Sequence, residues 1–133
     1  MPPHLRIARP VSNLARTTDM YCRGLGLCIV GRFEDHAGFD GVMLGFAGAG
    51  YHFEFTRYRH HPVAPAPTPE DLVVLYLADE TEWHAACDSL AGAGFDRVAS
   101  FNPYWDDAGR TFQDPDGYRI VLQREQWTNV ESS

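Results

Sequence analysis

Apolar and polar side chains alternate near the end of the chain in a pattern that is typical of a β-strand. Within residues 117–124, the apolar residues Tyr118, Ile120 and Leu122 occupy every second position, so a pleated segment would place them on one face. The preceding segment, residues 114–117 (DPDG), has the composition of a tight turn, because proline fixes φ, aspartate bonds the nearby backbone and glycine accepts a positive φ. A turn followed by a strand is therefore expected.

Turn signals and apolar positions occur in the same order in the two halves of the chain. Residues 24–27 (GLGL) correspond to residues 92–95 (GAGF), 68 positions later. After one deletion, residues 50–54 (GYHFE) correspond to residues 117–121 (GYRIV). A shared order of such segments is the signature of an internal repeat, so we expect two copies of one structural unit.

Each copy is predicted to contain a strand, a helix and three further strands, in the order βαβββ. The strands are expected at residues 5–11, 27–33, 41–47 and 51–58 in the first copy and at residues 71–77, 95–101, 109–114 and 117–124 in the second. The glycine-rich residues 45–50 (GFAGAG) lie between two of these strands and are expected to form a hairpin, because a phosphate-binding loop would need a strand followed by a helix.

A helix is predicted after the first strand of each copy. In the first copy, Ser12 or Asn13 can cap the helix and Gly24 is expected to end it. Its inward face is expected to carry Leu14, Thr18, Tyr21 and Cys22, which follow helical spacing. The helix of the second copy is expected from about Glu80 to Leu90.

The predicted organisation is a single α+β domain, residues 1–133, in which two tandem βαβββ units form a curved mixed sheet with a cleft. The units are expected at residues 4–58 and 71–124, joined by a proline-rich linker at 59–70 and followed by a tail at 125–133. Two such units can close their sheets around a shared concavity, and ligand sites favour such clefts.

Charge and composition narrow the possible partners. The net charge of −7 argues against nucleic acid, which requires clustered Lys and Arg. No apolar stretch is long enough for a membrane span or a secretory signal, so the protein is expected in the cytoplasm with no membrane partner. The three cysteines form no CxxC pair, and neither a disulfide framework nor a zinc cluster is expected.

The duplicated pattern, the helix entry at residues 13–27 (NLARTTDMYCRGLGL) and the turn and strand at residues 111–123 (TFQDPDGYRIVLQ) resemble the vicinal oxygen chelate superfamily. This superfamily includes glyoxalase I, extradiol dioxygenases, fosfomycin-resistance enzymes and bleomycin-resistance proteins. The similarity covers residues 4–124 and implies the glyoxalase/bleomycin-resistance/dioxygenase fold. It implies the activity only weakly, because the superfamily is chemically diverse.

The resemblance also indicates where a metal would be held. Enzymes of the superfamily usually bind a divalent ion through His, Glu, His and Glu on the first and last strands of each unit. In this chain those four positions correspond to Arg6, Glu54, Leu72 and Val121, so only the first glutamate remains. One carboxylate cannot hold a metal that generally needs three or more protein ligands. The chain is therefore similar to a branch that lacks the metal, and no cofactor is expected.

A shifted metal site stays open as an alternative. Moving the alignment of the first strand by two residues keeps the same face and replaces Arg6 by His4. His52 shares a face with Glu54, so His4, His52 and Glu54 could bind zinc, nickel, manganese or iron.

Without a metal, Arg6 and Glu54 are expected to pair with each other, because an unpaired charge away from water is costly. The guanidinium would offer a planar set of donors for a carboxylate or another oxyanion. Whether the pair binds a ligand or only closes the cleft stays open. Arg119 and Val121 share the second face of the last strand, which is expected to line the cleft.

Aromatic and polar residues in the loops complete the predicted site. Asn102, Tyr104 and Trp105 lie in a loop at residues 101–109, where rings can stack on a flat ligand. The predicted ligand-binding residues are Arg6, His52, Glu54, Tyr76, Asn102, Tyr104, Trp105 and Arg119.

The first functional hypothesis is a metal-free protein that binds a small, partly aromatic or anionic molecule for sequestration or resistance, as in the bleomycin-resistance branch. By the same resemblance a homodimer is expected. The alternatives are a metal-dependent lyase, isomerase or dioxygenase with a rearranged site, and a metal-free enzyme in which Glu54 or His36 transfers protons. The sequence leaves open whether a reaction is catalysed.

Overall fold

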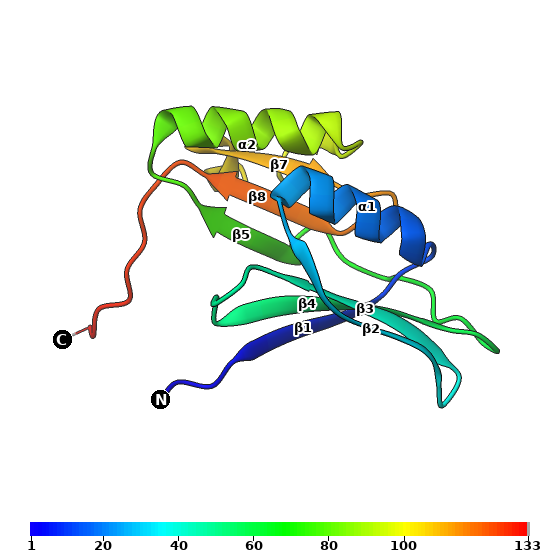
Figure 1. Ribbon diagram of the computed structural model, residues 1–133. Helices are drawn as coiled ribbons and strands as arrows, with labels where there is room; N and C mark the ends of the chain where they lie inside the picture. Colours follow the sequence, from blue (N-terminus) through cyan, green and yellow to red (C-terminus); the bar gives the residue numbers. More distant parts are fainter. Residues whose placement is uncertain (133) are drawn as a thin grey trace. The chain divides into compact units, whose positions relative to one another are not determined.

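The computed structural model describes residues 1–132 and consists of two compact units, residues 1–66 and the residues from 67 onward, which are described separately (Figure 1). The elements of unit 1 are β1 (Leu5–Pro10), α1 (Leu14–Leu25), β2 (Cys28–His36), β3 (Phe39–Gly45) and β4 (Tyr51–Tyr58). The elements of unit 2 are β5 (Leu72–Tyr76), α2 (Glu80–Gly92), β6 (Asp96–Val98), α3 (Tyr104–Asp107), β7 (Gly109–Gln113) and β8 (Arg119–Gln123).

The two units have the same topology, which confirms the predicted repeat. Unit 1 contains a four-stranded sheet in the order β1-β4-β3-β2, and unit 2 contains one in the order β5-β8-β7-β6. In each sheet the first and last strands of the unit pair in parallel, while the other neighbours are antiparallel. The fold is therefore α+β with two βαβββ units, as predicted, and each unit has its own four-stranded mixed sheet.

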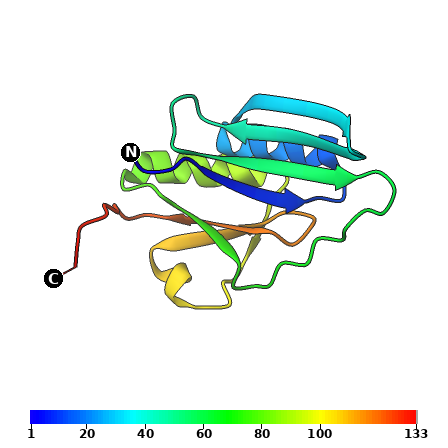
Figure 2. The same cartoon turned by 90° about the horizontal axis from the view of Figure 1, so that it is seen from below.

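One face of the unit 1 sheet packs against α1, which lies behind the sheet in Figure 2. The ring of Tyr21 contacts Phe53 and Phe55 on β4, with ring centroids 6.2 and 4.7 Å apart. Val42 and Leu44 on β3 are paired with these two phenylalanines and are also buried. Because side chains alternate along a strand, the residues between them point to the opposite face.

The inward face of α1 differs from the prediction. Asn13 caps the helix by accepting a hydrogen bond from the backbone N–H of Arg16, as expected. The helix ends at Leu25 and not at Gly24, and it is capped by Gly26, which has φ of 72°. Its buried residues are Thr17, Met20, Tyr21 and Gly24, whereas Leu14, Thr18 and Cys22 are only half-buried. Packing through Tyr21 rotates the helix so that these three residues lie beside the core.

The core of unit 2 lies between its sheet and α2. Buried Ile120 and Leu122 of β8 pack on this side together with Trp83 and Leu90 of α2. Trp83 donates its ring N–H to the backbone carbonyl of Leu122 at 2.8 Å, which satisfies the one polar group of this buried ring.

The predicted turn before β8 is confirmed. Asp114 accepts hydrogen bonds from the backbone N–H groups of Asp116 and Tyr118, at 2.9 and 3.0 Å. Gly117 has φ of 93°, a conformation that favours glycine. The hairpin between β3 and β4 is also confirmed.

The segment before β7 was predicted incompletely. The strand expected at residues 95–101 is limited to Asp96–Val98, and the short helix α3 follows within a segment that had been expected to be a loop. None of the helices in the described part of the chain has the length and apolar character that a membrane crossing requires.

Candidate functional site

The strands β1 and β4 bring Arg6, His52 and Glu54 together on the face of the unit 1 sheet that points away from α1. Arg6 is directly opposite His52 in the parallel pair. Its Nη1 lies 3.0 Å from Oε2 of Glu54, and its Nε donates to Nε2 of His52 at 2.8 Å. The predicted pairing of Arg6 with Glu54 is therefore confirmed as a contact. Nothing in this geometry requires a ligand, so binding at the pair stays a prediction.

The network continues to His4, which precedes β1. Nδ1 of His52 lies 2.7 Å from Nε2 of His4, and the ring centroids are 4.9 Å apart. His4, His52, Arg6 and Glu54 thus form a continuous hydrogen-bonded chain. We call this set the Arg6 network.

The surroundings of His52 favour its neutral form. Partial removal of the ring from water lowers the pKa of His52 below its ordinary value, and the positive charge of Arg6 and the proximity of His4 lower the pKa further. Glu54 acts in the opposite direction but is outweighed. Arg6 remains accessible, since 47% of its side chain is exposed, against 15% for Glu54.

The alternative metal ligands His4, His52 and Glu54 all lie in the Arg6 network, where they share their contacts with a guanidinium. Both ring nitrogens of His52 are engaged, one by His4 and one by Arg6, and the guanidinium also contacts Glu54. A fixed positive charge between the donors does not fit a divalent cation. Among residues 1–132, no group of three or more His, Cys, Asp or Glu side chains could hold a metal ion. Metal binding by His4, His52 and Glu54 therefore stays an untested alternative.

His36 lies far along the sheet from the Arg6 network. It ends β2 and is paired with Phe39, which is in turn paired with Tyr58 on β4. Tyr58 is four positions beyond Glu54, or about 13 Å along a strand. His36 is exposed and its ring contacts Phe33 edge-on. The two predicted acid/base candidates are therefore not brought together.

In unit 2, the predicted residues on β5 and β8 have partners within the unit. Tyr76 is 38% exposed, and its ring packs against that of Trp127 in the tail, with centroids 5.8 Å apart. Arg119 donates through Nε to Oε1 of Gln113 at 2.9 Å. Val121, which shares its face with Arg119, is fully buried, and the lining of a cleft by this face stays a prediction. The contact of Trp127 was not predicted, because the tail has no periodic pattern of apolar residues that would indicate which of them pack.

The loop candidates gather around α3. Asn102 accepts a hydrogen bond from the backbone N–H of Tyr104 at 3.1 Å, so its amide helps to start the short helix. The rings of Tyr104 and Trp105 meet edge to face, with centroids 4.9 Å apart. Tyr104 is exposed and Trp105 is half-buried. These residues can offer a ring surface to a ligand.

Two sequence profiles match the chain and together cover most of it. The profile of the YycE-like N-terminal domain matches residues 5–56, and that of the YycE-like C-terminal domain matches residues 70–124. The matched regions correspond to units 1 and 2.

Known proteins with similar sequence or structure agree with these matches. A YycE protein of Bacillus subtilis (strain 168) is 44% identical over 118 residues, which cover 89% of this chain and 85% of that protein. The crystal structure of a YycE protein of unknown function from Bacillus subtilis superimposes with a TM-score of 0.87 at 41% identity, covering 95% of this chain and 92% of that chain.

More distant structures share the fold. Glyoxalase I of Leishmania major has a TM-score of 0.71 at 17% identity, covering 94% of this chain and 88% of its own. TnmS3, an antibiotic binding protein from Streptomyces sp. CB03234, has a TM-score of 0.63 at 21% identity, covering 92% of this chain and 94% of its own.

Proposed function

Because the chain belongs to the YycE-like family of the glyoxalase/bleomycin-resistance superfamily, we propose that it binds a small, partly aromatic anion, with Arg6 as the anchor in place of a metal ion. The ligand would lie on the face of the unit 1 sheet that carries the Arg6 network. Binding would sequester the molecule without changing it.

The fixed guanidinium of Arg6 is the observation that carries this proposal. A guanidinium has five N–H donors. His52 takes one and Glu54 takes another, and no further acceptor within residues 1–132 bonds to Arg6. Three donors remain, on a side chain whose orientation is held from two sides and which is 47% exposed. A donor group that is already oriented loses less entropy when an oxyanion binds.

A protein of the same fold supports the choice of binding over catalysis. TnmS3 is described as an antibiotic binding protein. In the present chain, the aromatic residues Tyr76, Tyr104 and Trp105, together with Asn102 and Arg119, are proposed to add stacking and polar contacts to the bound molecule. Assembly as a homodimer is proposed on the superfamily resemblance alone.

Benzoate, salicylate and 1-naphthoate are suitable probes, because each combines a carboxylate with an aromatic ring. We expect at least one of them to shift the backbone amide resonances of β1 and β4 in NMR titrations. Arg6→Met should weaken that binding about tenfold or more, since a hydrogen bond to a charged group contributes about 1.5–3 kcal/mol. A chelator should leave the affinity unchanged.

Arg23→Met is the matched control, because Arg23 lies on α1 and pairs with Asp19 through an exposed i,i+4 contact. The affinity of Arg23→Met for the probes should equal that of the native protein. Equal affinity in Arg6→Met, or the absence of any shift on β1 and β4 with all three probes, would contradict the proposal. Binding that disappears with a chelator would favour a metal site instead.

A further inference from the structure

Unit 1 contains a groove on the opposite face of its sheet from the Arg6 network. The groove has a volume of about 670 Å³ and lies between α1 and the strands β2 and β3. Ile29 and Arg32 of β2 are paired with Leu44 and Val42, whose side chains point toward α1. Residues paired in this way share a face, so both line the α1 side of the sheet.

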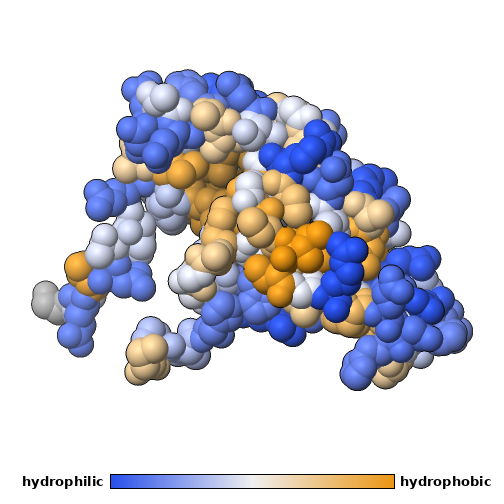
Figure 3. Space-filling model, in the orientation of Figure 1, coloured by the Kyte–Doolittle hydropathy of each residue, from blue (hydrophilic) through white to orange (hydrophobic). Residues whose placement is uncertain are grey.

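The apolar wall of the groove is built from residues that the sequence pattern assigned to the core. Leu14, Thr18 and Cys22 of α1 line it, together with Ile29 of β2. Ile29 is 45% exposed and its neighbour Val30 is 55% exposed. The hydroxyl of Thr18 donates to the backbone carbonyl of Leu14 at 2.8 Å, so it does not need a partner in the groove. Figure 3 shows apolar surface next to hydrophilic surface where α1 passes into β2.

The groove exists because α1 covers only part of the sheet. The helix packs against β3 and β4 and turns its buried side toward Tyr21 and its neighbours. The edge strand β2 is left without a covering element on this side among the described residues, and most of its residues are exposed. A cavity of this size, with an apolar wall and a few polar groups, has the character of a small-molecule site.

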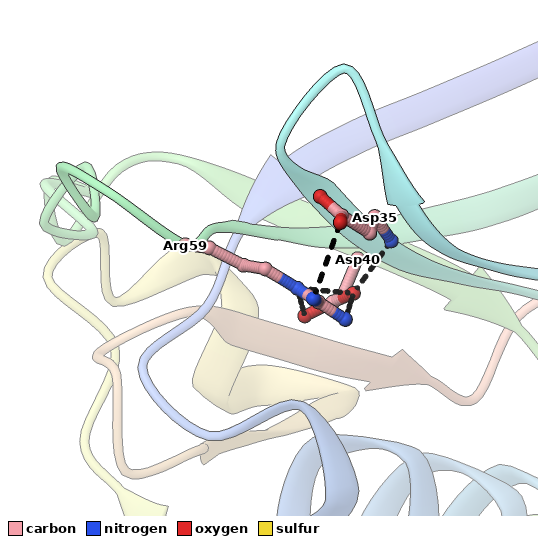
Figure 4. A network of polar contacts seen from close by, with 3 residues as sticks. All are labelled: Asp35, Asp40 and Arg59. Carbon is pink, nitrogen blue, oxygen red and sulfur yellow. Dashed lines mark hydrogen bonds and ion pairs between the residues drawn. The ribbon is translucent and has the colours of Figure 1, made fainter.

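At one end of the groove, two aspartates pair with one arginine (Figure 4). Arg59 contacts both carboxylate oxygens of Asp40, at 2.8 to 3.1 Å, and lies 3.5 Å from Asp35. The pKa of Asp40 is lowered, chiefly by the hydrogen bonds from Arg59 and then by the backbone N–H of Asp35. These acids are therefore already neutralised by a cation of the protein.

Arg32 is different, because no hydrogen bond or ion pair to its guanidinium is found within residues 1–132. The cations that lower the pKa of Asp40 are Arg59 and Arg57, and Arg32 is not among them. The acid on the helix wall, Asp19, is held by Arg23 at 3.0 Å. The groove thus offers one exposed guanidinium that is not committed to an acid of the protein, beside an apolar wall.

We propose that this groove is a second ligand site, which binds an amphipathic anion. The apolar body of the ligand lies along Leu14, Cys22 and Ile29, and its carboxylate or sulfonate binds Arg32. The site does not depend on the function proposed for the Arg6 network, because the two sets of side chains lie on opposite faces of the sheet.

The fluorescent probe 8-anilinonaphthalene-1-sulfonate tests the proposal, because it joins an aromatic body to a sulfonate. We expect saturable enhancement of its fluorescence, and amide shifts in NMR spectra that are confined to α1 and β2. Arg32→Gln should weaken binding about tenfold, and Arg32→Lys should restore part of the loss. Thr18→Phe, which fills the groove, should also abolish binding. Melting temperatures of each variant check that it is folded.

Arg16→Gln is the matched control, because Arg16 lies on α1 outside the groove and bonds to Ser12. It should bind the probe like the native protein, and so should Arg6→Met. Equal binding by folded Arg32→Gln, shifts that map outside α1 and β2, or no saturable enhancement would each overturn the proposal. Loss of probe binding in Arg6→Met would show instead that the probe binds to the Arg6 network.

Discussion

Arg6 donates a hydrogen bond to His52, with 2.8 Å between Nε of the guanidinium and Nε2 of the ring. Arginine stays protonated and has no lone pair to offer, so Nε2 of His52 must be the acceptor and carries no proton. The proton of the neutral ring is therefore on Nδ1, from which it is donated to Nε2 of His4 at 2.7 Å. One guanidinium thus determines the tautomers of two histidines.

The tautomer of His52 can be measured directly by NMR of the ring nitrogens. At pH 7.5 we expect the ring to be neutral with its proton on Nδ1, and its pKa to lie below the reference value of 6.5. Arg6→Met should remove the preference for this tautomer and raise the pKa of His52, because the charge of Arg6 contributes to the lowering.

Arg16→Met serves as the control, since Arg16 lies on α1, which packs on the opposite face of the sheet from His52. It should leave the tautomer and the pKa of His52 unchanged. A His52 ring that is protonated on Nε2 in the native protein, or that is unaffected by Arg6→Met, would contradict this account of the network.

The lowered pKa of His52 makes the stability of the fold depend on pH. As the pH falls, the unfolded chain takes up a proton on this ring at about pH 6.5, whereas the folded protein takes it up only at a lower pH. The contribution of neutral His52 is therefore present above this pH and is lost as the pH falls toward the folded pKa. His52→Gln keeps an acceptor for Arg6 but cannot titrate. Between pH 7.5 and 5.5, the urea midpoint of the native protein should fall more than that of His52→Gln, and an equal fall would contradict the linkage.

Local signals were sufficient to predict the repeat and most of the strands. The bounds of β4, residues 51–58, agree with the expected strand, because turn residues flank a clean alternation on both sides. The alternation also predicted that Glu54 shares a face with His52, and the parallel register with β1 then places Arg6 beside both. The Arg6–Glu54 pair could be predicted because it depends only on register and face.

Features that depend on packing between elements were not predictable in the same way. The hydrophobic pattern of α1 allows Leu14 and Cys22 to face the sheet, but Tyr21 fills that position and they line the groove instead. Val121 and Arg119 share one face of β8, yet Val121 is fully buried whereas Arg119 is only half-buried. Alternation assigns a side chain to a face, whereas the segments that cover the face decide its exposure.

The close packing of α3 against β7 can be tested at Gly109. A Cβ atom at this position would meet Oε1 of Gln123 and would lie 2.6 Å from the backbone carbonyl oxygen of Trp105. Gly109→Ala should therefore reduce the free energy of unfolding by about 1–3 kcal/mol, because the backbone must move. At Gly92, near the end of α2, a Cβ would meet nothing within 4 Å. Gly92→Ala should be neutral or stabilise by up to about 1 kcal/mol. If chemical denaturation gave the same change in the free energy of unfolding for Gly109→Ala and Gly92→Ala, the described packing of α3 would be contradicted.

The end of the groove can be tested through the titration of Asp40. Its pKa is lowered from 3.8, first by the hydrogen bonds from Arg59, and only last by the charge of Arg57. Arg59→Gln should therefore raise the pKa of Asp40 toward 3.8, as measured by the carboxyl ¹³C shift. Arg57→Gln, the matched control, should raise it much less.

A group with a lowered pKa stabilises the fold at pH values above its unfolded pKa, and this contribution is lost as the pH falls through the folded pKa. The backbone amide of Asp35, which donates to Oδ1 of Asp40 at 3.0 Å, should exchange faster with solvent in Arg59→Gln. If Arg57→Gln raised the pKa of Asp40 as much as Arg59→Gln does, long-range charge and not the bidentate contact would be the main cause of the lowered pKa. That result would contradict the described network at the end of the groove.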